Sequence, residues 1–152
     1  MYADYAFYTE SFYGSAIAEA DFPRLASRAS DFLDYYTLGK ATRVPEGDTA
    51  TLTALGKACC AVAEAMQEDD RNKALAAKAL TEALTASGGE IKSESVGSHS
   101  VSYTTAADYS KTGAAQSQRD MRAAYAEIAS VYLAQTGLLY RGGGCGCILH
   151  TQ

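Results

Sequence analysis

The fold is decided by residues 118–141, which read QRDMRAAYAEIASVYLAQTGLLYR. Apolar side chains recur there at four-three-four spacing, the period of one helix face; they are Met121, Tyr125, Ile128 and Tyr132, with Ala124 and Val131 widening the stripe. Asp120 is expected in the first turn, where a negative charge suits unpaired backbone N–H groups. Gly137 is expected to end the helix, because glycine readily adopts left-handed backbone. The pattern predicts a helix over 117–136.

The 152 residues predict one soluble domain of closely packed helices. Hydrophobic residues make up 47% of the chain, enough for a core, and many of them are alanine. No apolar run approaches the roughly 20 residues of a membrane span. The N-terminus lacks the basic region and following apolar stretch that are typical of a signal peptide. We expect a cytosolic protein without membrane association. Residues 1–141 would form the domain, and 142–152 a flexible glycine-rich tail.

The net charge of −5 is unevenly distributed. Residues 1–70 carry 12 acidic and 5 basic side chains, whereas residues 71–152 carry 6 acidic and 8 basic ones. The sequence has no cluster of Lys and Arg of the kind that lines a nucleic-acid groove. The polarity suits an oligomer whose faces attract one another, and ordinary solvated surface charge is the alternative.

Three further helices are expected upstream. The first covers 21–37, with Asp21 as N-cap and Pro23 in the first turn; its buried stripe comprises Phe22, Leu25, Ala26, Ala29, Phe32, Leu33 and Tyr36. The second covers 48–69 and is capped by Asp48 or Thr49; its stripe comprises Leu52, Leu55, Cys59, Val62 and Met66. The third covers 72–86 and is rich in alanine, so its apolar face is blurred.

Residues 1–20 are aromatic and irregular, and their period fits neither a helix nor a strand decisively. They are expected to be an arm. It either covers the core of its own subunit or contacts a neighbouring one.

After Ser87-Gly88-Gly89 the period changes from 3.6 to two, which predicts a β-hairpin over about 90–104 with its turn at Gly97. A lone hairpin is marginally stable in water, so this one should lean on the helices or on another subunit. The residues expected to make contacts between subunits are Ile91, Lys92, Glu94, Val96, His99, Val101 and Tyr103. Residues 105–117 are expected to be a small-polar loop.

The groups that could bind metal or act as nucleophiles form no recognisable site. Cys59 and Cys60 are adjacent, and Cα atoms about 3.8 Å apart fall short of the usual disulfide range. Cys59 lies on a buried stripe, where cysteine behaves as a small hydrophobe. Cys145-Gly-Cys147 is spaced more tightly than zinc-binding pairs usually are. We therefore predict no catalytic residues, no metal and no cofactor, and a protein that is not an enzyme.

Three segments together resemble a known family. They are the aromatic-glycine entry into the first helix at 9–30, the hairpin at 91–103 and the helix exit at 132–142. In this order they resemble the head–tail adaptor proteins, also called head-completion or connector proteins, of long-tailed bacteriophages and prophages of Gram-positive bacteria. The cysteines are not typical of that family.

The resemblance implies a structural virion protein: a small, mainly all-α bundle with one β-hairpin. About twelve copies would form a ring beneath the portal vertex and line part of the DNA channel. DNA would pass through without sequence-specific binding. The protein would lie in the neck of the virion, and in the host cytoplasm during assembly, between the portal protein and a tail-side neck or stopper protein. The segment implied to bind the portal includes Leu138, Leu139, Tyr140, Arg141, Ile148 and Leu149.

A second function stays open. The four cysteines would suit a cytosolic metal- or redox-linked regulatory protein, with ligands or thiols contributed by Cys59, Cys60, Cys145 and Cys147.

Overall fold

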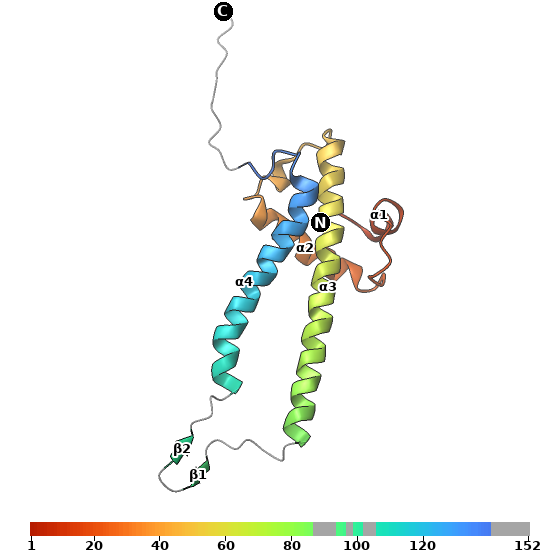
Figure 1. Ribbon diagram of the computed structural model, residues 1–152. Coiled ribbons are helices and arrows are strands. Elements are labelled where there is room, and N and C mark those ends of the chain that lie inside the picture. The colour runs from red at the N-terminus through yellow and green to blue at the C-terminus, as the bar shows by residue number, and fades with distance from the viewer. Residues whose placement is uncertain (87–93, 97–98, 102–105, 141–152) are drawn as a thin grey trace, which may run out of the picture.

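The computed structural model describes residues 1–86, 94–96, 99–101 and 106–140, with side chains at 1–78, 81 and 118–140 (Figure 1). The described chain is mainly helical, which confirms the all-α class. In chain order its elements are α1 (Tyr5–Glu10), α2 (Phe22–Tyr36), the 3-10 helix η1 (Ala41–Arg43), α3 (Thr49–Ala86), β1 (Glu94–Val96), β2 (His99–Val101) and α4 (Ala106–Leu133).

The longest element is α3, whose 38 residues span about 57 Å at about 1.5 Å each. It packs against both α2 and α4. Residues 1–70, which include the first part of α3, and residues 121–140 pack together in a unit that we call the head. Beyond the head, α3 and α4 continue and diverge towards β1 and β2, which lie at the far end of the molecule (Figure 1).

The hydrophobic core lies in the head, where α2, α3 and α4 meet. Its fully buried side chains include Leu25 and Leu33 from α2, Leu55 and Val62 from α3, and Leu133 from α4. Rings also join the elements, since Phe32 meets Tyr125 edge to face at a centroid distance of 5.6 Å. From Arg71 onwards, every side chain of α3 that the structure describes is exposed. The apolar stripe predicted for 48–69 therefore matches the part of α3 that has a core to bury it.

The sequence predicted α2 closely. The helix begins at Phe22 with Pro23 in its first turn, and its predicted stripe faces the core. Asp21 occupies the N-cap position, but its side chain accepts no capping hydrogen bond. At the start of the helix a backbone carbonyl acts as acceptor instead, because Phe22 N–H donates to the Ala18 carbonyl at 3.1 Å.

The division of 48–86 into two helices was wrong, because α3 runs unbroken through residues 70 and 71. The charged stretch around Asp69 and Asp70 contains neither glycine nor proline, so nothing in its backbone chemistry stops a helix. The start of α3 was predicted correctly, because the Asp48 carboxylate accepts from Thr51 N–H at 3.1 Å. Hydrogen bonding from the Thr51 side chain, and then from its backbone, lowers the pKa of Asp48.

The predicted bounds of the last helix were also wrong. Helix α4 begins at Ala106 and ends at Leu133, so the expected loop over 105–117 is largely helical and Asp120 does not lie in a first turn. Its buried face consists of Tyr125, Ala129 and Leu133, flanked by the half-buried Met121, Ile128 and Tyr132. Ala124 and Val131 are exposed, Val131 to 74%, and do not widen the stripe.

The aromatic N-terminal segment covers the core of its own subunit. Tyr8 is fully buried, and its ring lies 4.9 Å from that of Phe22 between centroids. Two glycines let rings of this segment lie close to the backbone: a Cβ at Gly14 would lie 2.0 Å from the Tyr8 ring, and one at Gly56 would lie 2.7 Å from the Phe7 ring. The interpretation of residues 1–20 as a covering arm is thus confirmed.

At the far end, β1 and β2 pair antiparallel, with Glu94 opposite Val101 and Val96 opposite His99. The expected turn at Gly97 and the outer parts of the segment 90–104 lie outside the described residues. No helix in the described part of the chain is long and apolar enough to cross a membrane.

Candidate functional site: the surfaces of the head

The predicted portal-binding residues do not share one environment. Leu138 is only 9% exposed and packs in the core, so little of its side chain is open to a partner. Leu139 is half-buried against the core, whereas Tyr140 is 65% exposed. Arg141, Ile148 and Leu149 lie outside the described residues. Tyr140 is therefore the described residue of this group that a partner can reach most easily.

The exit from α4 is held in place by local and long-range hydrogen bonds. Thr136 Oγ1 donates to the Leu133 carbonyl at 2.8 Å and accepts from Leu138 N–H at 3.3 Å. Gly137 has a φ of +73°, which confirms the left-handed turn expected there. Lys40 Nζ donates to the Tyr140 carbonyl, which joins the exit to the connection after α2. Tyr140 is thus presented on a fixed backbone.

The end of α2 carries a second exposed apolar group, which the sequence did not reveal. Helix α2 closes with two bonds of a Schellman motif: Gly39 N–H donates to the Asp34 carbonyl at 2.8 Å, and Leu38 N–H donates to the Tyr35 carbonyl at 3.2 Å. Leu38 consequently has a φ of +56°, at a position where glycine is usual. Leu38 is 64% exposed and Tyr35 is 69% exposed.

A buried hydroxyl fastens the N-terminal arm to α3. Tyr8 Oη donates to Glu64 Oε1 at 2.7 Å and accepts from the N–H groups of Ala16 and Ile17 at 2.9 and 3.1 Å. Burial, followed by the hydrogen bond to Glu64, raises the pKa of Tyr8. This contact fixes the turn around Tyr13 and Gly14, in which Tyr13 has a φ of +58° and is 84% exposed.

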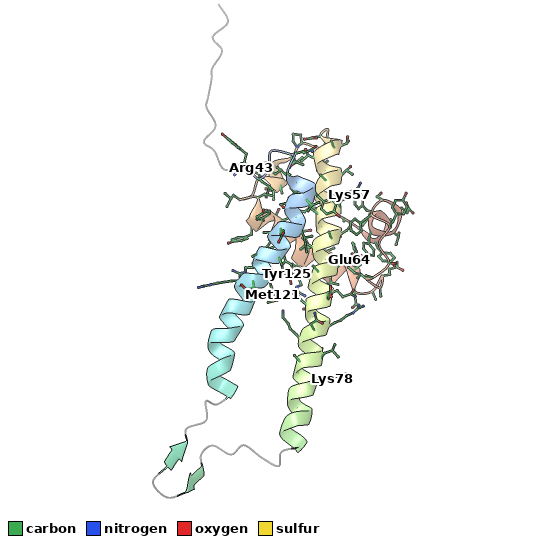
Figure 2. All side chains as sticks on the ribbon, viewed as in Figure 1. Arg43, Lys57, Glu64, Lys78, Met121 and Tyr125 are labelled. Carbon is green, nitrogen blue, oxygen red and sulfur yellow. The ribbon has the colours of Figure 1, made fainter. Side chains whose placement is uncertain are left out.

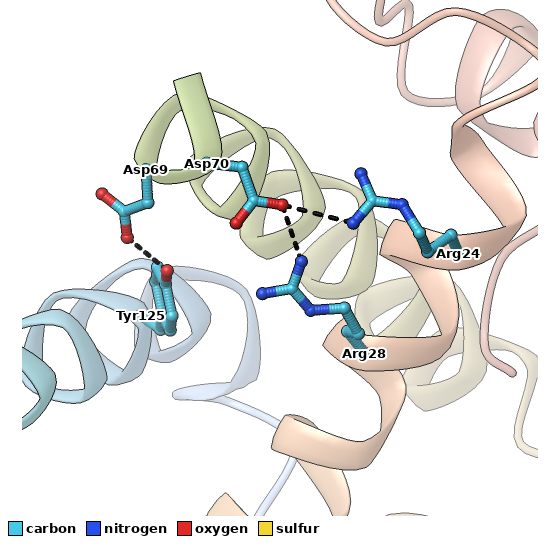
Figure 3. Close-up of polar contacts among 5 residues, drawn as sticks. All are labelled: Arg24, Arg28, Asp69, Asp70 and Tyr125. Carbon is cyan, nitrogen blue, oxygen red and sulfur yellow. Dashed lines mark hydrogen bonds and ion pairs between the residues drawn. The ribbon is translucent and has the colours of Figure 1, made fainter. Parts of the chain in front are cut away.

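Polar contacts also link α2 and α4 to the middle of α3 (Figure 3). Asp70 accepts from Arg28 at 2.8 Å and from Arg24 at 3.3 Å. Burial opposes ionisation of Asp70, but these two guanidinium groups outweigh it and lower its pKa. On the adjacent residue, Asp69 accepts from the Tyr125 hydroxyl. The acidic stretch in the middle of α3 therefore serves to join three helices.

The two cysteines of α3 are free thiols packed in the core and fully buried. Burial raises the pKa of Cys59 and, with the charges of Cys59, Glu64 and Asp4, raises that of Cys60 to about 12. Thiols that stay protonated at neutral pH are poor nucleophiles and poor metal ligands. Among the described residues, no group of three or more His, Cys, Asp or Glu side chains is placed to hold a metal ion. Cys145 and Cys147 lie outside those residues.

The predicted inter-subunit residues lie far from these surfaces. Glu94, Val96, His99 and Val101 belong to the β1–β2 pair at the opposite end of the molecule from the α4 exit (Figure 1). Ile91, Lys92 and Tyr103 lie outside the described residues. Between the two ends, α3 presents an exposed stretch with Lys78 beyond the head (Figure 2).

Comparison with known proteins gives no relative: no family model, no curated protein and no solved structure matches the chain.

Proposed function

We propose that this protein is a head–tail adaptor of a long-tailed bacteriophage or prophage, a structural ring component that links the portal to the tail side. The three segments at 9–30, 91–103 and 132–142 support the proposal through their resemblance to that family. The observation that carries it furthest is the placement of two of them. The α4 exit and the β1–β2 pair lie at opposite ends of an elongated molecule, so one chain can contact a different partner at each end (Figure 1).

The portal contact is assigned to the segment that follows α4. Tyr140 is exposed on a backbone fixed by Lys40, and Ile148 and Leu149 are the large apolar residues further along the chain. Burying both of those side chains would contribute about 3–6 kcal/mol, at roughly 1.5–3 each. One such contact is weak after the cost of ordering the chain, but a ring engages many at once. DNA passes through the ring without being read.

The test uses portal rings made from the portal gene expected beside this one. The full chain should co-sediment with them, and electron microscopy should show an added ring below the portal. Removing residues 142–152 should abolish co-sedimentation and leave the melting temperature unchanged, since the described core ends at Leu139.

The matched control is Leu75→Ala, which removes an equally apolar, exposed side chain beyond the head. It should leave portal binding intact. Failure of the full chain to bind the portal would overturn the adaptor function, whereas binding by the truncated chain would move the portal contact to another part of the molecule.

A further inference from the structure

Two residues of the head are unusual in both backbone conformation and exposure to water. Tyr13 and Leu38 are the non-glycine residues with positive φ in the described chain, at +58° and +56°. Left-handed backbone favours glycine or asparagine, and exposure to water favours polar side chains. Both positions nevertheless hold a large apolar side chain, exposed to 84% at Tyr13 and 64% at Leu38. A backbone cost at large apolar side chains that stay mostly exposed points to a role outside the subunit.

The two residues lie in stretches of the chain that carry opposite net charge. The stretch 4–21, which we call the acidic flank, carries Tyr13 and four exposed acids and contains neither Lys nor Arg; the acids are Asp4, Glu10, Glu19 and Asp21. The stretch 35–43, which we call the basic flank, carries Tyr35 and Leu38 with Lys40 and Arg43, and contains no acid. The two flanks thus carry opposite net charge around their apolar anchors, although Arg71 reaches the acidic flank by donating to the Ala16 carbonyl at 3.4 Å and Asp34 directly precedes the basic flank.

The two flanks lie on opposite sides of the head. Helix α1 of the acidic flank stands at one edge, and Arg43 of the basic flank stands at the other, with α3 and α4 between them in the view (Figures 1 and 2). Two different surfaces on opposite sides of one subunit are what a head-to-tail contact between copies requires, and such contacts close into rings when the rotation permits.

We propose that the acidic flank of one copy binds the basic flank of the next copy, with Tyr13 and Leu38 as the apolar anchors of the contact. Opposite charges steer the flanks together, and the anchors supply the buried apolar area at the centre. The proposal rests on the proposed ring, because it names the surfaces through which copies of that ring meet.

The test exploits the backbone at these positions. Asparagine suits left-handed backbone, so Leu38→Asn and Tyr13→Asn should fold with a melting temperature equal to or above that of the unchanged chain. Sedimentation velocity over a concentration series of the purified chain alone should show self-association. Each variant should raise the dissociation constant by about tenfold or more. Leu75→Asn is the control, because Leu75 is also 64% exposed but lies in α3, where its φ is not positive.

Mixing the variants gives the sharper result. The Tyr13→Asn chain keeps an intact basic flank and the Leu38→Asn chain keeps an intact acidic flank. An equimolar mixture should therefore form one-to-one dimers that grow no further, while each variant alone stays monomeric. Native mass spectrometry identifies the mixed dimer by mass.

The inference is overturned if the unchanged chain stays monomeric, if either variant associates like the unchanged chain, if the mixture forms no mixed dimer, or if Leu75→Asn dissociates the protein equally. Because no portal is present, these outcomes are independent of portal binding. An adaptor that binds the portal through other inter-subunit contacts, and a self-associating chain that binds no portal, give different results in the two assays.

Discussion

A single hydroxyl, that of Tyr8, connects the N-terminal arm to α3 and to the segment leading into α2. Changing Tyr8 to Phe would remove the donor to Glu64 and leave the N–H groups of Ala16 and Ile17 without their acceptor. Unpaired buried polar groups are costly, so we expect the free energy of unfolding to fall by about 1–3 kcal/mol in urea titrations. Tyr35→Phe, at an exposed ring, is the control and should change it little. An unchanged stability in Tyr8→Phe would contradict the role of the hydroxyl.

Gly14 and Gly47 differ in the space available for an added side chain. A Cβ at Gly14 would lie 2.0 Å from the Tyr8 ring, whereas a Cβ at Gly47 would meet nothing within 4 Å. Gly14→Ala should therefore destabilise the protein by about 1–3 kcal/mol through overpacking. Gly47→Ala should be neutral or slightly stabilising, since it restricts the unfolded chain. Thermal melts of the two variants compare them directly; equal effects would show that the arm does not pack as described.

Three tyrosine–carboxylate contacts make the joints between elements sensitive to alkaline pH. Tyr2 donates to Asp34, Tyr8 to Glu64 and Tyr125 to Asp69. Burial and then the carboxylate raise each phenol pKa above its ordinary value of 10.0. Because the folded-state pKa exceeds the unfolded one, this stabilisation is complete below about pH 10 and is lost as the pH rises further.

Melting temperatures measured upwards from neutral pH should therefore stay level and then fall as the pH passes about 10. Tyr125→Phe should make that fall shallower, and Tyr35→Phe should leave it unchanged. A fall of equal steepness in Tyr125→Phe would exclude this phenol as a contributor.

The helices show how far the sequence could predict the elements. Helix α2 was predicted almost to the residue, because its apolar stripe is continuous and Pro23 marks its start. The continuity of α3 was missed because the partners that justify its charged middle are far away in sequence: Asp70 is held by Arg24 and Arg28. The early start of α4 was not predicted, because the small polar residues of 105–117 are typical of loops, whereas the alanines among them favour helix.

The β1–β2 pair remains a prediction as an inter-subunit contact. Replacing residues 92–102 by a short Gly-Ser link should leave the melting temperature of the head unchanged, because the described core lies at the other end of the molecule. Ring formation should weaken, as judged by electron microscopy. A control link of the same composition replacing residues 142–147, outside both flanks, should not have that effect on rings. Normal rings without residues 92–102 would exclude the pair from the contact.

At the scale of the whole molecule, the sequence predicted the composition of the surfaces better than their location. The charge polarity is visible in the sequence, but the sequence does not separate the buried Leu138 from the exposed Tyr140, because an apolar residue after a helix looks the same whether it is exposed or fills the core. Leu38 was invisible because its left-handed backbone arises from the closing bonds of α2, and nothing in the residue type announces it. Such positions can be identified only from the folded backbone.

The unbroken course of α3 has a mechanical consequence. Neither Pro23 nor Pro45 lies within Thr49–Ala86, so the helix has no proline at which to kink. It acts as a lever whose pivot is the head. The 16 residues from Arg71 to Ala86 extend about 24 Å beyond the head, so a tilt of about 10° at the pivot displaces the far tip by about 4 Å. A circle of such levers would work like the blades of an iris, so that a small adjustment where the copies touch would set the width of the opening at the distant end.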